Sequence, residues 1–359
     1  MKQYIGCDAH KQYSIFCAMD EKGRVSPPHR VEHTREELRA FLQELPPGSP
    51  IAIETIGNWY WIIDEMEQAG HQPQLAHARE AKKLMGKSNK TDKLDARGLA
   101  TLLRNGTLPT VWIPPSPLRD QRELPRMRMV FVRMRTTLKN RIHATFAKYA
   151  IHFEGVSDLF GGSGRRELEK HRKELPPETQ RSVGEELTLL DQLETQIQSI
   201  EAHVSEVVQE TPKIQLLDTL PGVGPILAIV QALEIGDVER FPGPEHLASY
   251  AGTVPRIHES GGKRYDGRVR PDVNRYLKWA FVEAANVVVL NQTRWGDRHV
   301  VQLYQRIRKR KGHAKAVVAV ARHLAEAAYW VLKKGEPYRE PQSTRSLKGK
   351  NQTLSSTPR

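Results

Sequence analysis

The sequence predicts an α/β domain with a mixed sheet, followed by a central helical segment and a mainly helical C-terminal domain. Three observations support this prediction. Short apolar runs alternate with helical patterns as far as about Pro109, a Pro-rich linker WIPPSP follows at 112–117, and apolar residues then recur at helical spacing. A chain of 359 residues is also too long for a typical single core. We place the domains at 1–115, 116–210 and 211–335, with a tail at 336–359.

In the first domain, the runs YIGCD and SIFCAM predict two strands, and the turn DEKG closes the second one. The run SPIAIE predicts a further strand that ends at Glu54, followed by a helix over 59–69 and a strand near 74–76. Cys7 and Cys17 show no spacing typical of a zinc or redox site. We therefore expect buried thiols on neighbouring strands.

The central segment begins with the basic stretch RELPRMRMVFVRMRTTLKNRIHATFAKYA, whose Pro125 suits the first turn of a long helix. Beyond a Gly-rich turn at 161–164 and a Pro pair at 176–177, apolar residues recur at spacings of three and four. These residues are Leu190, Leu193, Ile197, Ile200, Val204 and Val207. They predict a short coiled-coil seam, which is compatible with packing inside one protomer and with a dimer contact.

The final domain, from about Thr211 to Lys334, is predicted to be mainly helical. The tail that follows is rich in Ser, Thr, Pro and Lys, a composition typical of disorder.

The charge balance predicts a polyanionic partner. Lys and Arg outnumber Asp and Glu by 55 to 42, which gives a formal net charge of +13. The apolar stretch near 279–290 is interrupted by Glu283 and Asn286 and is too short for a membrane span. The N-terminus MKQYIGCDAHK has no apolar signal core, so we expect a cytoplasmic protein that binds nucleic acid and no membrane.

Four acidic residues are candidates for one metal site. Asp8 and Glu54 end predicted strands, whereas Asp92 and Asp95 are three apart on a predicted helix and share a face. Convergent carboxylates repel each other unless a cation lies among them, and Mg²⁺ prefers such oxygen ligands. Each acid also has a simpler explanation, because Asp92 beside an N-cap at Thr91 stabilises a helix dipole and acids are common at strand ends.

The strings YIGCDAHK, IAIETIGNWYW and NKTDKLDARGLA resemble the motifs of insertion-sequence transposases with a RuvC-like N-terminal domain. These recombinases carry a DEDD metal site and are related to Piv-type DNA invertases. The resemblance implies a ribonuclease-H-like fold, and it implies that Asp8, Glu54, Asp92 and Asp95 are catalytic Mg²⁺ ligands. RuvC itself is a Holliday-junction nuclease, so the fold alone does not separate a nuclease from a transposase.

The segment VPRIHESGGKRYDGRVR places Ser260 before two glycines and among cations. Those that we expect to contact nucleic acid are Arg256, Lys263, Arg264 and Arg268. From composition alone, a basic loop that only holds DNA is the better interpretation. The resemblance reverses this preference, because the family carries a serine in an Arg-rich, E-S-G-type segment, and that position corresponds to Ser260.

Upstream, LLDTLPGVGPILAIV places Gly222 and Gly224 in a tight turn, with Pro225 at the first position of the next helix. This pattern is similar to a helix-hairpin-helix, which presents backbone N–H groups to a phosphate. An ordinary helical hairpin explains it equally well.

The basic stretch is interpreted either as a solvated helix face or as a nucleic-acid-binding helix. For the second interpretation the contacts are Arg126, Arg128, Arg133, Arg135, Lys139 and Arg141. The resemblance adds a structured noncoding guide RNA, transcribed from the element, as a partner that this region binds.

The sequence and the resemblance together predict a DNA transposase in which Ser260 attacks a DNA phosphate with Mg²⁺ assistance. No nucleotide-binding loop is recognised, and strand transfer through a phosphoserine needs no ATP. Because the acids and the serine lie in different domains, we expect a homodimer or homotetramer. The alternatives are a RuvC-like nuclease that uses water, for which Ser260 is dispensable, and a non-catalytic nucleic-acid-binding protein, for which all four acids are dispensable.

Overall fold

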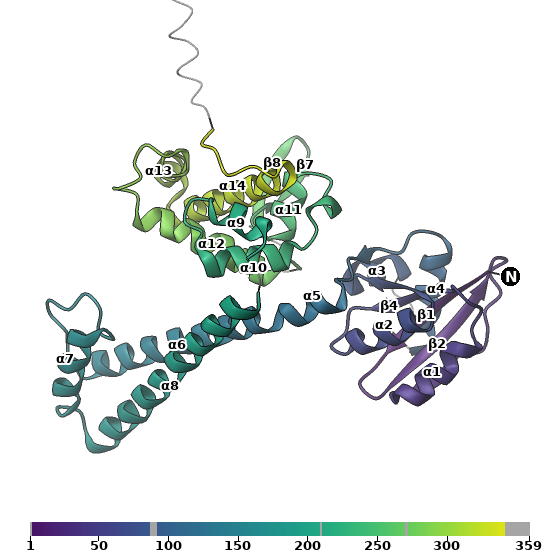
Figure 1. Ribbon diagram of the computed structural model, residues 1–359, viewed down its shortest axis with the longest axis horizontal. Coiled ribbons are helices and arrows are strands. Elements are labelled where there is room, and N and C mark those ends of the chain that lie inside the picture. The colour runs from purple at the N-terminus through teal and green to yellow at the C-terminus, as the bar shows by residue number, and fades with distance from the viewer. Residues whose placement is uncertain (1, 87–91, 209, 270–271, 342–359) are drawn as a thin grey trace, which may run out of the picture. The chain divides into compact units, whose positions relative to one another are not determined.

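The computed structural model describes residues 2–86, 92–208, 210–269 and 272–341. The chain divides into two compact units, Met1–Arg119 and Asp120–Arg359 (Figure 1). The boundary between the units lies close to residue 115, where the first domain is predicted to end.

Unit 1 is built on a mixed sheet with the strand order β3-β2-β1-β4-β5-β6. The strands β1, β2 and β3 form an antiparallel meander, whereas β4 and β5 run parallel to β1. The strands are β1 (Gln3–Ala9), β2 (Tyr13–Asp20), β3 (His29–Glu32), β4 (Pro50–Glu54), β5 (Gln72–Ala76) and β6 (Thr110–Val111). The helices are α1 (Arg35–Glu44), α2 (Trp59–Gln68), α3 (Ala78–Met85), α4 (Asp92–Arg104) and α5 (Ser116–Gln121), which reaches past the unit boundary. The predicted α/β domain with a mixed sheet is thereby confirmed.

The two faces of this sheet are covered by different helices because successive side chains of a strand point to opposite faces. Ile5 and Cys7 of β1 pack in the core that includes Leu38 of α1 and Ile62 of α2. Gly6, between them, faces α4. Cys7 is fully buried, and burial raises the pKa of its thiol, so the sulfur stays protonated at neutral pH. The predicted buried thiols are confirmed, because Cys17 is buried as well.

Unit 2 begins with two long helices that lie along each other, α6 and α8 (Figure 1). Pro125 is the third residue of α6 and lies in its first turn, as predicted. The predicted seam on α8 is buried from Leu190 to Val204, whereas Val207 is 47% exposed. The seam therefore packs within one protomer, and its last predicted residue is outside it. The helices of this part are α6 (Glu123–Lys148), α7 (Gly162–Arg172) and α8 (Pro177–Val207).

The rest of unit 2 is mainly helical, as predicted, and holds one two-stranded ribbon among the described residues. Its elements are α9 (Pro212–Asp218), α10 (Pro225–Ile235), the 3-10 turn η1 (Val238–Arg240), α11 (Pro244–Tyr250), β7 (Pro255–Ser260), β8 (Lys263–Val269), α12 (Arg275–Leu290), α13 (His299–Lys311) and α14 (His313–Lys334). None of the helices that the structure describes is both long enough and apolar enough to cross a membrane.

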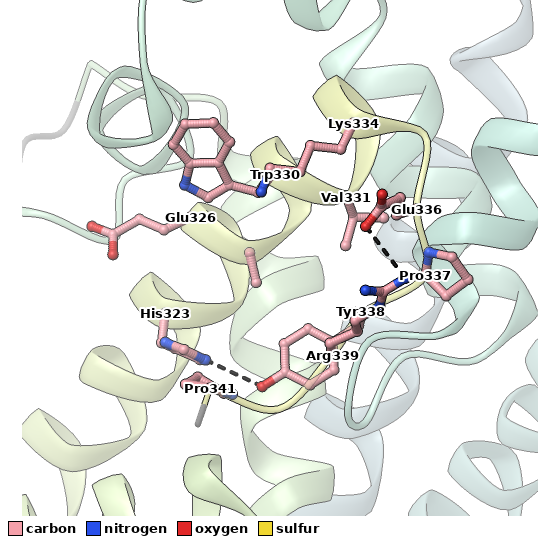
Figure 2. Close-up of a pocket in the computed structure, with 11 residues that line it drawn as sticks. His323, Glu326, Trp330, Val331, Lys334, Glu336, Pro337, Tyr338, Arg339 and Pro341 are labelled. Carbon is pink, nitrogen blue, oxygen red and sulfur yellow. Dashed lines mark hydrogen bonds and ion pairs between the residues drawn. The ribbon is translucent and has the colours of Figure 1, made fainter. Parts of the chain in front are cut away.

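The segment that follows α14 folds back along it, contrary to the disorder predicted from residue 336. The backbone N–H of Tyr338 donates to Thr219 Oγ1 at 2.9 Å, and that of His299 donates to Glu340 at 3.0 Å. Figure 2 shows the cavity of about 410 Å³ that this segment encloses with α14, with Trp330 and Tyr338 in its lining. The prediction was wrong for 336–341 because it considered composition alone, and residues 342–359 lie outside the described part.

Candidate functional site

Two of the four candidate acids lie side by side in the sheet. The parallel pairing of β1 and β4 matches Cys7 with Ile53, and Asp8 and Glu54 are the next residue on each strand. Both belong to the face that α4 covers, since Asp8 alternates with Gly6, and Glu54 with Ala52, which packs with the α4 side chains. The structure therefore brings Asp8 and Glu54 to neighbouring positions at one sheet edge.

Asp8 is a buried carboxylate, with 8% of its surface exposed, whereas Glu54 is partly exposed. The Nε2 atom of His10 lies 3.3 Å from Oδ2 of Asp8. Sequence reasoning did not single out His10, although it follows Asp8 by only two residues.

The helix that carries the other two candidate acids, α4, lies directly on β1. A Cβ at Gly6 would be 1.9 Å from the carbonyl oxygen of Ala96, so this close approach requires glycine. Asp95 precedes Ala96 on α4 and is partly exposed. Asp92 is the first residue of α4, so the two acids share a helix as predicted. The side chain of Asp92, and Thr91 as a whole, lie outside the described residues.

The donor chemistry of this edge suits a hard divalent cation, because the two strand ends provide carboxylate oxygens. Among the described side chains, no group of three or more His, Cys, Asp or Glu residues is close enough to hold a metal ion. The Asp92 side chain lies outside the described residues, so this finding does not include it. The edge thus provides two carboxylates on adjacent strands, and further ligands would have to come from elsewhere, for which Asp92 and Asp95 of α4 are the predicted candidates.

The candidate nucleophile lies at the tip of the β7–β8 ribbon. Ser260 ends β7 and pairs with Lys263, the first residue of β8. The two residues between them, Gly261 and Gly262, have φ values of +57° and +72°. Positive φ at both central positions is typical of a type I′ turn, which glycine adopts without strain. The turn leaves Ser260 exposed, with the exposed Lys263 opposite it.

The cations around the ribbon are only partly described. The side chain of Arg256 is 35% exposed, and its Nη2 atom lies 3.8 Å from Oδ1 of Asp272. The side chains of Arg264, Arg268 and His258 lie outside the described part. Of the four predicted phosphate contacts of this segment, Lys263 is exposed and Arg256 lies near an acid, and their contact with phosphate stays a prediction.

The two glycines of the PGVG turn have different roles. Gly222 has φ +78°, and a Cβ there would lie 2.2 Å from the carbonyl oxygen of Ala284 on α12. Gly224 is the N-cap residue of α10 and has open space around its Cα, and Pro225 is the first residue of that helix, as predicted. Packing against α12 explains Gly222, so only Gly224 offers a backbone that a phosphate could approach.

The cations of α6 are largely held by acids of the same chain. Arg128 Nε donates to Glu201 at 2.6 Å, and Arg135 Nη1 donates to Glu194 at 3.0 Å. The other pairs are Lys139 with Glu194, Arg141 with Glu186, and Arg126 with Glu234. Arg133 is exposed, and no ion pair holds it among the described residues. Nucleic acid that bound this helix would compete with glutamates of α8 for four of the six predicted contacts, and with Glu234 of α10 for a fifth.

A buried polar network, which sequence reasoning missed, joins α6 to α10 and α12. Glu234 is 2% exposed and accepts from Arg126 Nε at 2.7 Å and from Asn274 Nδ2 at 2.7 Å. Arg122 lies 3.7 Å from the same carboxylate, and its burial lowers the pKa of the guanidinium. Asn274 also caps α12 and follows the ribbon closely in the chain. No local pattern signals this contact, because Arg126 and Glu234 are 108 residues apart.

Comparison with known proteins gives matches along most of the chain. A family model described as Transposase, of the DEDD type of IS110, matches residues 5–151, and a model described as Transposase IS116/IS110/IS902 family matches residues 214–300. A probable family 20 transposase of Pseudomonas aeruginosa is 26% identical over 84% of this chain and 89% of its own length. The transposase for insertion sequence element IS1111A of Coxiella burnetii is 25% identical over 93% of this chain and 91% of its own. The pilin gene-inverting protein of Moraxella bovis is 26% identical over 40% of this chain and 45% of its own.

Proposed function

Because the chain belongs to the IS110/IS116/IS902 family of transposases, enzymes of DNA cleavage and transfer, we propose that it cuts and rejoins DNA through a covalent phosphoserine at Ser260. One observation carries the proposal. Ser260 is an exposed hydroxyl at the end of a strand, beside a two-glycine turn that has no side chains of its own. A DNA backbone can therefore approach the Oγ atom closely.

In the proposed step, Ser260 Oγ attacks a DNA phosphorus as the bond from phosphorus to the leaving deoxyribose oxygen breaks. The serine loses its proton, and the leaving oxygen gains one to become a free hydroxyl. A hydroxyl of the second DNA strand then displaces the serine from phosphorus. Each exchange replaces one phosphoester with another, so the bond energy is kept and no ATP is needed.

We further propose that Asp8, Glu54, Asp92 and Asp95 hold Mg²⁺. The DEDD domain model indicates that the enzyme depends on a divalent metal, and carboxylate oxygens suit Mg²⁺ in particular. When bound, the ion supplies charge stabilisation on phosphate oxygens. The pairing of β1 with β4 supports a site that includes Asp8 and Glu54, and the packing of α4 on β1 supports the inclusion of acids from that helix.

Three finer assignments belong to the same proposal. The mixed sheet, with β2 antiparallel to β1 and β4 parallel to it, supports a ribonuclease-H-like (RuvC-like) fold for unit 1. The α9–turn–α10 segment supports a helix-hairpin-helix, with Gly224 at the phosphate. A guide RNA and a homodimer or homotetramer are proposed from the family resemblance, and the net charge of +13 supports the RNA.

The test is a search for a denaturant-resistant protein–DNA adduct in cells that carry the native element. Wild type is compared with Ser260→Ala and with Ser205→Ala, a control that removes an exposed hydroxyl from α8. We expect the adduct in wild type and in the control, with the linked peptide containing Ser260, and none in Ser260→Ala. If Ser260→Ala cleaves DNA as well as wild type does, the enzyme uses water and the proposal fails.

A further inference from the structure

The corner between α13 and α14 is rich in Lys and Arg residues. From Arg298 to Ala325 the chain has eight Lys and Arg residues and no Asp or Glu. This stretch alone therefore has a formal charge of +8, against +13 for the whole chain. Its exposed cations at the corner are Arg306, Arg308, Lys309, Arg310, Lys311 and Lys315.

Three of these cations share one face of α13. Arg306, Lys309 and Arg310 are spaced by three and four residues, which places them together on a helix surface. Val301 and Tyr304 are buried and define the opposite face of the helix. We call the surface formed by Arg306, Lys309 and Arg310 the α13 face.

The helix that carries the α13 face is anchored by a buried side chain and by a contact with the start of α14. Tyr304 is 2% exposed, and its hydroxyl lies 2.8 Å from Nδ1 of His313 at the start of α14. Gly312 joins the two helices with φ +81°, a conformation that favours glycine. The cations are thus presented by packed helices and not by a loop.

The cations of α6 and those of the α13 face differ in whether acidic residues of the chain hold them. On α6, the glutamates of α8 hold Arg128 and Arg135. On the α13 face, none of the three cations has an ion pair with another described residue. A phosphate that binds α6 must displace a carboxylate, whereas a phosphate that binds the α13 face displaces only water and counterions.

We propose that the α13 face binds the backbone phosphates of duplex DNA. Binding of unpaired bases normally uses exposed aromatic side chains as stacking platforms. The only Phe, Tyr or Trp residue of α13, Tyr304, is buried. A cationic face without such a platform suits the regular phosphates of a duplex and reads no sequence. The inference rests on the DNA substrate of the family and not on the serine mechanism.

The test is the salt dependence with which the full-length protein binds a duplex of arbitrary sequence, followed by fluorescence anisotropy. The variant replaces Arg306, Lys309 and Arg310 with Gln. If three phosphate contacts are lost, the plot of the logarithm of the association constant against the logarithm of the salt concentration becomes less steep, by roughly 2.7 in slope. Wild type should then lose roughly 40-fold more affinity than the variant between about 50 and about 200 mM salt.

The control replaces Arg165, Lys170 and Arg172 of α7 with Gln, which removes the same formal charge from residues that have acidic partners. It should keep the wild-type slope. A charge-preserving variant, Arg306→Lys with Arg310→Lys, should keep it too, because the contact is electrostatic. Circular dichroism verifies that all variants are folded.

The proposal is overturned if the α13 variant has the slope of wild type or of the α7 control. It is also overturned if affinity falls only for single-stranded DNA or for a structured RNA, while duplex binding is unchanged. The result is independent of the phosphoserine, because Ser260→Ala leaves the α13 face intact. Loss of adduct with a normal salt slope, or the reverse, separates the two proposals.

Discussion

Asp8 and Glu54 are the residues that follow the last paired positions of the parallel strands β1 and β4, and both belong to the sheet face that α4 covers. Two carboxylates 46 positions apart in the chain thus become neighbours through strand pairing. This relationship makes the edge of the sheet the strongest candidate for the metal-dependent part of the reaction.

Replacing Glu54 with Gln should abolish DNA cleavage and leave the fold intact. The change keeps the shape of the side chain and removes one anionic ligand, so we expect activity to fall by at least about 100-fold, the scale of 3 kcal/mol of transition-state stabilisation. Glu44→Gln, an exposed site at the end of α1, is the control and should be fully active. Cleavage is measured on a duplex substrate. Equal activity of the two variants would remove Glu54 from the proposed site.

Replacing Gly6 with Ala should destabilise unit 1, because the new Cβ would overlap the Ala96 carbonyl oxygen. We expect a loss of about 1–3 kcal/mol in the free energy of unfolding, the range typical of overpacked cores. Gly57→Ala adds the same methyl group where no atom lies within 4 Å and should be close to neutral. Urea denaturation compares the two. A neutral Gly6→Ala would mean that α4 does not lie against β1 as described.

The turn next to Ser260 should tolerate Asn and reject Val. Gly261 has φ +57°, a region that Asn enters more readily than other residues and that a β-branched side chain avoids. We expect Gly261→Val to slow adduct formation at Ser260 strongly, whereas Gly261→Asn retains most of it. Thermal melting should be similar for both, because the turn is exposed. Equal adduct yields would show that the turn geometry does not control the serine.

Glu65→Gln should weaken unit 1 at neutral pH and have little effect in acid. Glu65 is 1% exposed and accepts from Arg39 Nε at 2.6 Å, with Arg35 on the same carboxylate. The hydrogen bond from Arg39 is the main cause of the lowered pKa of Glu65. We expect a cost of about 1–3 kcal/mol at neutral pH, where the wild-type carboxylate is charged.

The loss of stability caused by Glu65→Gln should decrease as the pH falls. Because the pKa of Glu65 is lowered by folding, its contribution is present above the unfolded pKa and is lost as the pH falls through the folded pKa. The difference in urea midpoint between wild type and Glu65→Gln should therefore shrink as the medium becomes strongly acidic. A difference that stays constant with pH would point to lost packing and not to lost charge.

Several local features could be predicted from the sequence because local chemistry governs them. Pro125 and Pro225 lie in the first turns of α6 and α10, where a missing N–H costs nothing. The run that ends at Glu54 is a strand with that same end. The apolar seam on α8 could be predicted, but the helix that packs against it could not. The same spacing is found in helices that pair between two protomers and in helices that pair within one.

Other features could not be predicted from local sequence patterns. The predicted cations of α6 looked alike in the sequence, yet Glu201 and Glu194 of α8 hold three of them and Glu234 of α10 holds a fourth. Composition suggested a disordered tail, whereas Tyr338 and Glu340 contact residues far earlier in the chain. The exposed cations of α13 were not singled out, because a charge run is normally only a solvated face.

By itself, the sequence determined the alternation of strands and helices, the helix starts at proline, the basic charge, and the four acids and one serine as candidates, since each depends on residue type and on spacing within a few positions. Only the tertiary structure decided that Asp8 and Glu54 are neighbours and that α4 packs closely against Gly6. It also decided that most arginines of α6 have acidic partners, whereas Arg306 and Arg310 of α13 have no ion pair among the residues that the structure describes. These features depend on residues tens to more than a hundred positions apart. The physical reason is that strand register and helix packing, which bury apolar surface across the whole chain, choose the partner of each charge, and no local pattern contains that choice.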